Sequence, residues 1–208
     1  MRVSGLVFSA LSVALAAQLL MCESLADTPA TETIVMVRHG EKPPQGLGQL
    51  DCQGLNRALA LPAVISKMFG RPAAIFAPNP AVQKFDEGVA YDYIRPLATI
   101  EPAAVVFGLP VDTSIGLTDI ATLKTRLADP KFQNEVVLVG WEHIQIVQLA
   151  RDIMSKFGGD PASVPKWEGS DFDGIYVIRI ARAGASVTAS FERREEGLNN
   201  RSTACPGQ

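Results

Sequence analysis

The chain has 208 residues, with 19 Lys and Arg against 22 Asp and Glu, which gives a formal net charge of −3 at pH 7. This mild acidity argues against nucleic acid as a general partner, because nucleic-acid-binding domains need a basic surface. The three cysteines and two histidines are scattered and no Cys-x-x-Cys occurs, so we expect no metal site and no cofactor.

The first 26 residues have the pattern of a secretory signal peptide. Arg2 supplies a positive n-region, 6–21 is an apolar run of signal-peptide length, and Ser24-Leu25-Ala26 resembles a small-x-small cleavage site. No other stretch is apolar and long enough to span a bilayer. We therefore expect a secreted or periplasmic protein in which 27–208 form a single domain. A lipoprotein acylated at Cys22 is the alternative, although Met21 replaces the small residue expected before it.

Two cysteines, Cys52 and Cys205, remain after such cleavage. In an oxidising compartment they are candidates for one disulfide, which would tie the C-terminal tail to the first helix. Two unpaired thiols are the alternative.

The first predicted strand ends in a polar motif. The apolar run 34–37 is typical of a strand buried on both faces. Gly40 and the prolines at 43–44 prevent its continuation, so Arg38 and His39 lie at the carboxyl end of a central strand, the edge where open α/β sheets bind ligands. The guanidinium of arginine binds two phosphate oxygens at once. A nearby cation also favours a neutral imidazole that keeps a lone pair for attack. An isolated Arg-His-Gly remains a weak signal by itself.

A helix is predicted next, with Asp51 as its N-cap and Gly70 at its end. Pro62 should kink this helix or divide it. A short strand over 73–77 and a loop follow, with prolines at 78 and 80.

A second helix should begin near Arg95, because the following Pro96 is tolerated in a first helical turn. An anion there would meet both the guanidinium and free backbone amides. An edge strand over 111–115 and a helix over 120–127, capped by Thr118, come next.

The run 135–140 predicts a second buried strand that also ends at a glycine, and 144–157 continues at helical spacing. His143 therefore occupies the same kind of position as His39. If the two strands are neighbours in a parallel sheet, both histidines converge on one crevice.

The last elements are a turn at Asp171 to Gly174, a strand over 175–180, and a hairpin that leads into 186–191. Asp171 and Asp173 are expected to shape the turn. The charged tail from Arg193 should be extended on the surface.

Together these motifs resemble those of the histidine phosphatase superfamily, also called phosphoglycerate mutase-like. Arg38-His39-Gly40 matches its signature, and 50–58 resembles its Leu-x-x-x-Gly-x-x-Arg-Ala helix. Arg95 with Thr99 is similar to its Arg-x-x-x-Thr segment, and the strand before His143 is similar to the one that carries its second histidine. Here Trp141 and Glu142 stand between that strand's glycine and His143.

The resemblance implies a three-layer α/β/α sandwich with a mostly parallel central sheet. It implies that His39 is the nucleophile that forms a phosphohistidine, and that Arg38, Arg95 and His143 bind the non-bridging phosphate oxygens. Phosphoryl transfer requires in-line positioning and charge stabilisation, which this set of side chains can supply.

The proton donor for the leaving group stays open among three acids. Asp119, in Leu117-Thr118-Asp119, stands where many relatives have a catalytic glutamate, but it is equally suited to cap a helix. Glu142 and Glu41 are the alternatives, because each neighbours a histidine. Without a well-placed acid, the enzyme would favour good leaving groups, such as phosphoramidates or acyl phosphates.

These features favour an exported, metal-independent phosphomonoesterase, a phosphoric monoester hydrolase of the histidine acid phosphatase type that acts on a small phosphorylated substrate. A phosphomutase, a phosphate-binding module that has lost turnover, and a structural secreted domain are the alternatives. The physiological substrate and the oligomeric state are not indicated by the sequence.

Overall fold

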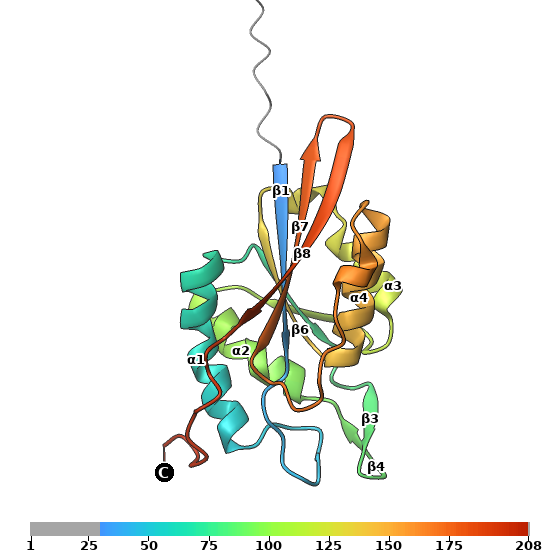
Figure 1. The fold of residues 1–208 in the computed structure, drawn as a ribbon. Helices are drawn as coiled ribbons and strands as arrows, with labels where there is room; N and C mark the ends of the chain where they lie inside the picture. The colour runs from blue at the N-terminus through green and yellow to red at the C-terminus, as the bar shows by residue number, and fades with distance from the viewer. Residues whose placement is uncertain (1–29, 208) are drawn as a thin grey trace, which may run out of the picture.

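The computed structural model describes residues 30–207, so the predicted signal peptide and Cys22 lie outside the described residues. A six-stranded sheet has the order β5-β2-β6-β1-β7-β8 (Figure 1). Its strands are β1 (Ala30–Arg38), β2 (Ala74–Pro78), β5 (Val111–Ile115), β6 (Val136–Trp141), β7 (Gly174–Ala183) and β8 (Ser186–Glu195). The α-helices are α1 (Cys52–Phe69), α2 (Arg95–Phe107), α3 (Ile120–Leu127) and α4 (His143–Lys156). Of these described helices, none is long and apolar enough to cross a membrane.

Four strands of the sheet are parallel. β1 pairs with β6, β6 with β2, and β2 with β5, all in parallel. β7 pairs antiparallel with β1, and β8 antiparallel with β7. The predicted sheet, mostly parallel and with β1 in its interior, is confirmed.

Two apolar cores lie on opposite faces of the sheet, because successive side chains of a strand point to opposite sides. Val35 and Val37 of β1 pack with residues of α1 and α2, including Leu61 and Ile100. Ile34 and Met36 of the same strand belong to the other core, which includes residues of α3 and α4. The helix pairs α1–α2 and α3–α4 accordingly cover the two faces of the sheet (Figure 1). The predicted three layers are confirmed.

Helix α1 is continuous from Cys52 to Phe69, so Pro62, which was expected to kink or divide the helix, does not divide it. Proline removes one backbone hydrogen bond from a helix. Leu61 and Ile65, on either side of it, are completely buried, and this packing holds the two parts of the helix in place. Asp51 is the N-cap as predicted, and its side chain accepts a hydrogen bond from the Gly54 amide at 2.8 Å.

The segment predicted as a loop after β2 contains a two-stranded hairpin, β3 (Gln83–Asp86) and β4 (Val89–Asp92). Its turn residues, Glu87 and Gly88, both have positive φ angles, of 48° and 84°. This backbone conformation matches the twist of a tight hairpin. A further difference is the cap of α3, which is Asp119 and not Thr118.

A buried charge network joins α1 to both ends of the β7–β8 hairpin. The completely buried Arg57 guanidinium donates hydrogen bonds to Glu41, Asp173 and Glu196. Asp171 accepts hydrogen bonds from the amides of Asp173 and Gly174, so it shapes the turn as predicted. Because a buried charge needs partners, this network fixes the loop after β1 against the C-terminal strands.

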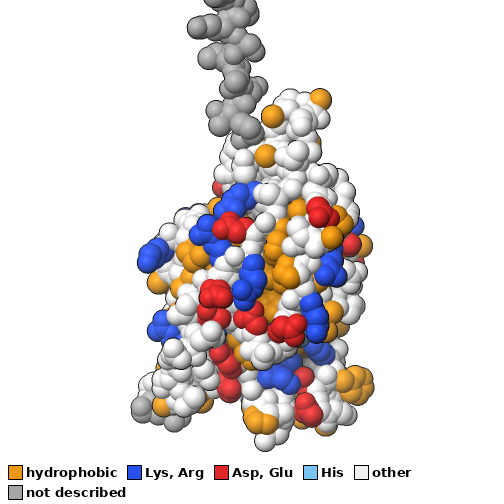
Figure 2. All heavy atoms as spheres, in the orientation of Figure 1, with side chains coloured by type: hydrophobic (Ala, Val, Ile, Leu, Met, Phe, Trp, Pro, Cys, Tyr) orange, Lys and Arg blue, Asp and Glu red, His pale blue; other side chains and the backbone are white. Residues whose placement is uncertain are grey.

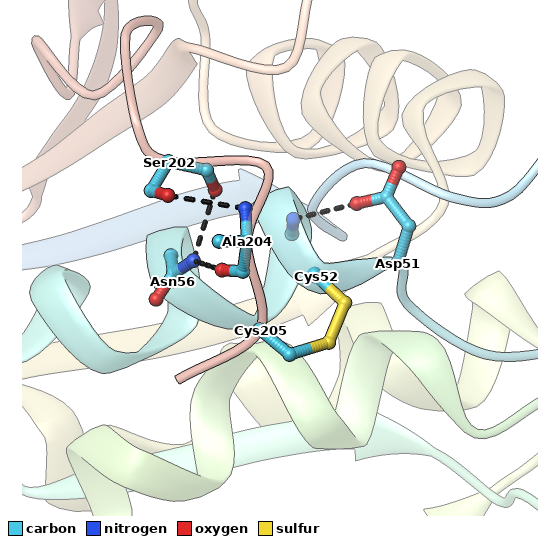
Figure 3. Close-up of a disulfide and its surroundings, with 7 residues drawn as sticks. Asp51, Cys52, Asn56, Ser202, Ala204 and Cys205 are labelled. Carbon is cyan, nitrogen blue, oxygen red and sulfur yellow. Dashed lines mark hydrogen bonds between the residues drawn. A yellow bond between two sulfur atoms is a disulfide. The ribbon is translucent and has the colours of Figure 1, made fainter. Parts of the chain in front are cut away.

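The C-terminal tail returns to α1, where Cys52 and Cys205 form a disulfide as predicted (Figure 3). The amide of Asn56, one turn further along α1, donates hydrogen bonds to the carbonyls of Ser202 and Ala204, at 2.9 and 2.8 Å. The tail is therefore attached to the helix by one covalent bond and by side-chain hydrogen bonds.

Replacing both Cys52 and Cys205 by serine should lower the free energy of unfolding by about 2–4 kcal/mol, because the bond constrains a long loop in the unfolded chain. Urea denaturation measures this change. As a control, dithiothreitol should destabilise the wild type by a similar amount and leave the variant unaffected. An unchanged urea midpoint in the variant would contradict a stabilising role.

Candidate active site

The parallel pairing of β1 and β6 brings the two histidines to one edge of the sheet. Arg38 lies opposite Trp141 in the register, and the His39 amide donates to the Trp141 carbonyl at 3.1 Å. His39 thus follows β1 directly, and His143 begins α4 two residues after β6. The predicted placement of both residues at the carboxyl ends of adjacent strands is confirmed.

His39 is held in one tautomer. Its Nδ1 lies 2.8 Å from the carbonyl oxygen of Gly40, which can only accept, so Nδ1 carries the proton and Nε2 keeps a lone pair. Arg95 Nε donates to that Nε2 at 3.3 Å. Burial lowers the pKa of His39 well below its ordinary value, and the charges of Arg95 and Arg38 lower it further. The hydrogen bond to the Gly40 carbonyl raises this pKa but does not offset the lowering. The imidazole is therefore neutral and held in one orientation, with a lone pair on Nε2.

Two glycines allow the loop after His39 to lie directly against α1. A Cβ built on Gly40 would come within 2.9 Å of Gly54 Cα, and one built on Gly54 would lie 2.3 Å from the Glu41 carbonyl oxygen. The Gly40 amide donates to Thr99 Oγ1 at 2.9 Å, and that hydroxyl donates to the Arg95 carbonyl at 2.7 Å. The glycines and Thr99 of the sequence motifs therefore position His39 through close backbone packing.

Arg38 is buried beside His39. Its Nη1 donates to the carbonyls of Gly169 and Asp171, both at 2.8 Å, and its guanidinium lies 4.0 Å from the centre of the Phe172 ring. Its Nε is buried without a hydrogen-bond partner among the described residues. Burial lowers the pKa of Arg38, and the charge of Glu142 opposes this shift. An unpaired buried donor of this kind is suited to an anion.

Arg95 contacts two groups. Its Nε faces His39, and its two terminal nitrogens face the carboxylate of Asp86. Nη1 and Nη2 donate to the two oxygens of Asp86 on β3, at 2.5 and 3.0 Å. Although burial opposes it, the hydrogen bond from Arg95 keeps the pKa of Asp86 below its ordinary value. Asp86 therefore orients Arg95, and it also occupies nitrogen atoms that could otherwise bind phosphate.

Glu142 positions the second histidine. One oxygen of its carboxylate lies 2.7 Å from His143 Nδ1, and the other accepts from the amides of Ile144 and Gln145 at the start of α4. Burial would raise the pKa of Glu142, but its contact with His143 and the charge of Lys84 lower it below the ordinary value. Glu142 is thus an ionised helix cap whose carboxylate lies beside His143 Nδ1.

Lys84 of β3 adds a cation that the sequence pattern did not indicate. Its Nζ lies 3.9 Å from Glu142 and 4.9 Å from the centre of the Tyr93 ring, and that ring meets His39 edge-on, with centroids 6.0 Å apart. Burial lowers the pKa of Lys84, and the charge of Glu142 opposes this shift. Side chains at alternate positions after the Glu87-Gly88 turn, Val89, Tyr91 and Tyr93, offered a signal for this hairpin.

The other two candidate acids have structural partners. Asp119 is exposed, and its carboxylate caps α3 through the Thr122 amide at 3.2 Å. Glu41 binds Arg57 with both oxygens. Within residues 30–207 no contact joins either acid to His39 or His143. In the same part of the chain, no three His, Cys, Asp or Glu side chains are grouped so that they could hold a metal ion.

The edge of the sheet thus brings together a neutral histidine and two buried arginines, Arg38 and Arg95. Comparisons with known proteins bear on the fold. No protein-family model and no curated protein matches the sequence. Solved structures do match: a mycobacterial glucosyl-3-phosphoglycerate phosphatase in complex with inorganic phosphate is 16% identical, with a TM-score of 0.54 over 77% of this chain and 95% of that one.

Two further structures are similar. One is described as mycobacterial hydrolase 2, at 14% identity and a TM-score of 0.54 over 78% of this chain and 89% of that one. The other is the putative phosphohistidine phosphatase SixA from Nakamurella multipartitia, at 16% identity and a TM-score of 0.50 over 80% of this chain and 98% of that one. The chain therefore has a phosphoglycerate mutase-like α/β fold, which confirms the fold that the motifs predicted.

Because burial and the charges of Arg95 and Arg38 lower its pKa, the His39 imidazole should stay neutral at a pH well below the usual histidine pKa of about 6.5. Histidine gains its proton as pH falls through its pKa, so a lowered pKa extends the neutral range toward acid. Because the chain has two histidines, the variant His143→Asn leaves one imidazole signal for an NMR titration. Unfolding in urea should restore a midpoint near the usual value. A midpoint near the usual histidine value in the folded protein would contradict the lowered pKa of His39.

Proposed function

We propose that the protein is a phosphomonoesterase that works through a phosphohistidine on His39 without a metal ion. The observation that carries the proposal is the lone pair of His39 Nε2, held neutral by burial and flanked by Arg38 and Arg95. The similar structures named as phosphatases support the same class of reaction.

In the first step Nε2 attacks phosphorus, the N–P bond forms, and the bond from phosphorus to the leaving group breaks with its electron pair. In the second step the oxygen of water attacks phosphorus and the water gives up a proton to solvent, while the electron pair of the N–P bond returns to Nε2 as phosphate leaves. Dividing hydrolysis into two transfers is covalent catalysis. Arg38, Arg95 and His143 stabilise the charge on the phosphoryl oxygens.

The electrostatics of the site favour an anion. Arg38, Arg95, Lys84 and Lys42 bring four cationic side chains to the region, against the carboxylates of Asp86 and Glu142. The Arg95 N–H that donates to the lone pair of His39 can transfer its hydrogen bond to a phosphoryl oxygen, which releases the lone pair for attack.

We propose that the preferred substrates have good leaving groups, such as phosphoramidates or acyl phosphates. Each carboxylate considered as a proton donor is occupied: Asp119 caps α3, Glu41 binds Arg57, and Glu142 is an ionised cap beside His143. A leaving group that departs easily needs little help from an acid. The phosphohistidine in the name of one similar structure is itself a phosphoramidate.

A phosphate-binding module with impaired turnover is the second candidate function. The observation that favours it is the Asp86 carboxylate bound to the terminal nitrogens of Arg95, because its negative charge repels a bound dianion.

We further propose that residues 1–26 direct export, so that a protein recovered from the periplasm or medium would begin at Asp27.

The central test is the release of phosphate from p-nitrophenyl phosphate in EDTA by the chain from Asp27 onward, compared with the variant His39→Ala. We expect turnover by the wild type and a loss of at least about 10³-fold in the variant, because the nucleophile is gone. Rapid quenching with a radiolabelled substrate should trap an acid-labile phosphoenzyme in the wild type alone. Turnover that survives in His39→Ala would contradict the mechanism. Phosphate binding without turnover would favour the binding module.

The leaving-group proposal is tested with phosphoramidate, acetyl phosphate and an alkyl phosphate. We expect kcat/KM for the alkyl phosphate to be at least about 10²-fold lower, which is the usual contribution of a general acid. The variant Asp119→Asn should match the wild type on all three substrates, because asparagine also caps a helix. A selective loss of alkyl phosphate turnover in that variant would instead identify Asp119 as the acid.

A further inference from the structure

A groove beside the candidate active site begins at His143 and runs along α4. Its volume is about 630 Å³, and its lining includes His143, Val147 and Arg151 on one side and Lys166, Trp167 and Gly169 on the other. This volume lies within the range of sites for small organic ligands. Hydrophobic side chains gather between α4 and the β7–β8 hairpin on the face shown in Figure 2.

The groove is joined to the catalytic residues at one end. His143 lines it directly, and the Gly169 carbonyl on its opposite wall accepts the hydrogen bond from Arg38. Trp167 Nε1 donates to the Asp171 carbonyl, which also accepts from Arg38. The two walls therefore end at the two side chains that are proposed to bind phosphate oxygens, so a group bound to that phosphate would enter this groove.

Three residues of α4 lie in line along the groove. His143, Val147 and Arg151 are spaced by four residues, so they share one face of the helix. With a rise of 1.5 Å per residue, the backbone of Arg151 lies about 12 Å from that of His143. Along this distance the groove presents first His143, which is proposed to bind phosphate, then the apolar Val147, and then the cationic Arg151. Ile144, which also lines the groove, adds a side chain that is 63% exposed.

The charge at the far end favours an anion. Arg151 donates to the Val164 carbonyl from Nε and Nη2, which fixes its guanidinium, and in the described part of the chain it has no carboxylate partner. Asp152 also lines the groove, but it lies 3.7 Å from Lys124, which offsets its charge. Lys166 adds a second cation, within 3.5 Å of the exposed Glu168.

We propose that this groove binds the leaving group of the substrate, and that this group has an apolar or aromatic body and an anionic end. The inference rests on the proposed function, because the phosphoryl group at His39 and His143 sets the position of the rest of the substrate. Val147 and Ile144 contact the body, and Arg151 binds the anion. These residues determine specificity and take no part in the chemical steps.

Non-hydrolysable phosphonates test the proposal without a need for turnover. Isothermal titration calorimetry compares methylphosphonate, which fills only the phosphate site, with biphenylphosphonates that carry a 4′-carboxylate or a neutral 4′-carboxamide. We expect the carboxylate to bind at least about tenfold more tightly than methylphosphonate, since the groove buries its rings. It should also bind roughly threefold to fivefold more tightly than the carboxamide, because only the carboxylate forms an ion pair with Arg151, and exposed ion pairs contribute about this much.

Arg151→Gln should remove the preference for carboxylate over carboxamide and leave methylphosphonate binding unchanged. Ile144→Gln, at an exposed position that should not disturb folding, should weaken both biphenyl ligands alone. Lys156→Gln is the matched control, because Lys156 belongs to the same helix but does not line the groove. It should bind all three ligands as the wild type does.

The outcomes separate the two proposals. If methylphosphonate binds but the biphenyl ligands bind no more tightly, or if Arg151→Gln keeps the carboxylate preference, the groove proposal is overturned while the proposed function stands. If methylphosphonate does not bind the wild type, the phosphate site itself is wrong, and the groove proposal is rejected with it.

Discussion

The site depends on the parallel pairing of β1 and β6. Both strands are buried on both faces, so their register cannot shift without moving apolar side chains out of two cores. That register places Arg38 opposite Trp141 and bonds the His39 amide to the Trp141 carbonyl. The two histidines then emerge at one edge of the sheet, one in the loop after β1 and the other at the start of α4. Every further feature of the site is arranged around this edge.

Burial determines the chemistry at that edge. It keeps His39 neutral in the presence of two arginines, and it leaves an Arg38 donor without a partner in the part of the chain described. The acidic side chains are meanwhile used to orient other groups: Asp86 holds Arg95, and Glu142 holds His143. Among the described residues, each acid considered as a proton donor therefore has another partner, which is why we propose substrates whose leaving groups depart easily.

The motif residues outside the phosphate site act through packing and charge. Gly40 and Gly54 let the loop after His39 lie on α1, and Arg57 joins that helix to the turn before β7 and to the end of β8. The disulfide then attaches the tail to the same helix. The loop that follows His39 is consequently held by residues that lie far apart in the sequence. Low overall identity with the similar structures is compatible with one fold, since few positions carry these constraints.

Local patterns in the sequence determined the strands of the sheet, the helix over 120–127 and the placement of His39 and His143, because burial on both faces and helix capping leave clear periodic signals. Only the tertiary structure decided which groups meet. The pairing of Lys84 and Asp86 with site residues depends on where the β3–β4 hairpin lies. The roles of Glu41, Glu142 and Asp119 depend on partners that sequence spacing does not reveal. Charged side chains take their function from neighbours that are distant in sequence, because burial and the approach of opposite charges are set by packing.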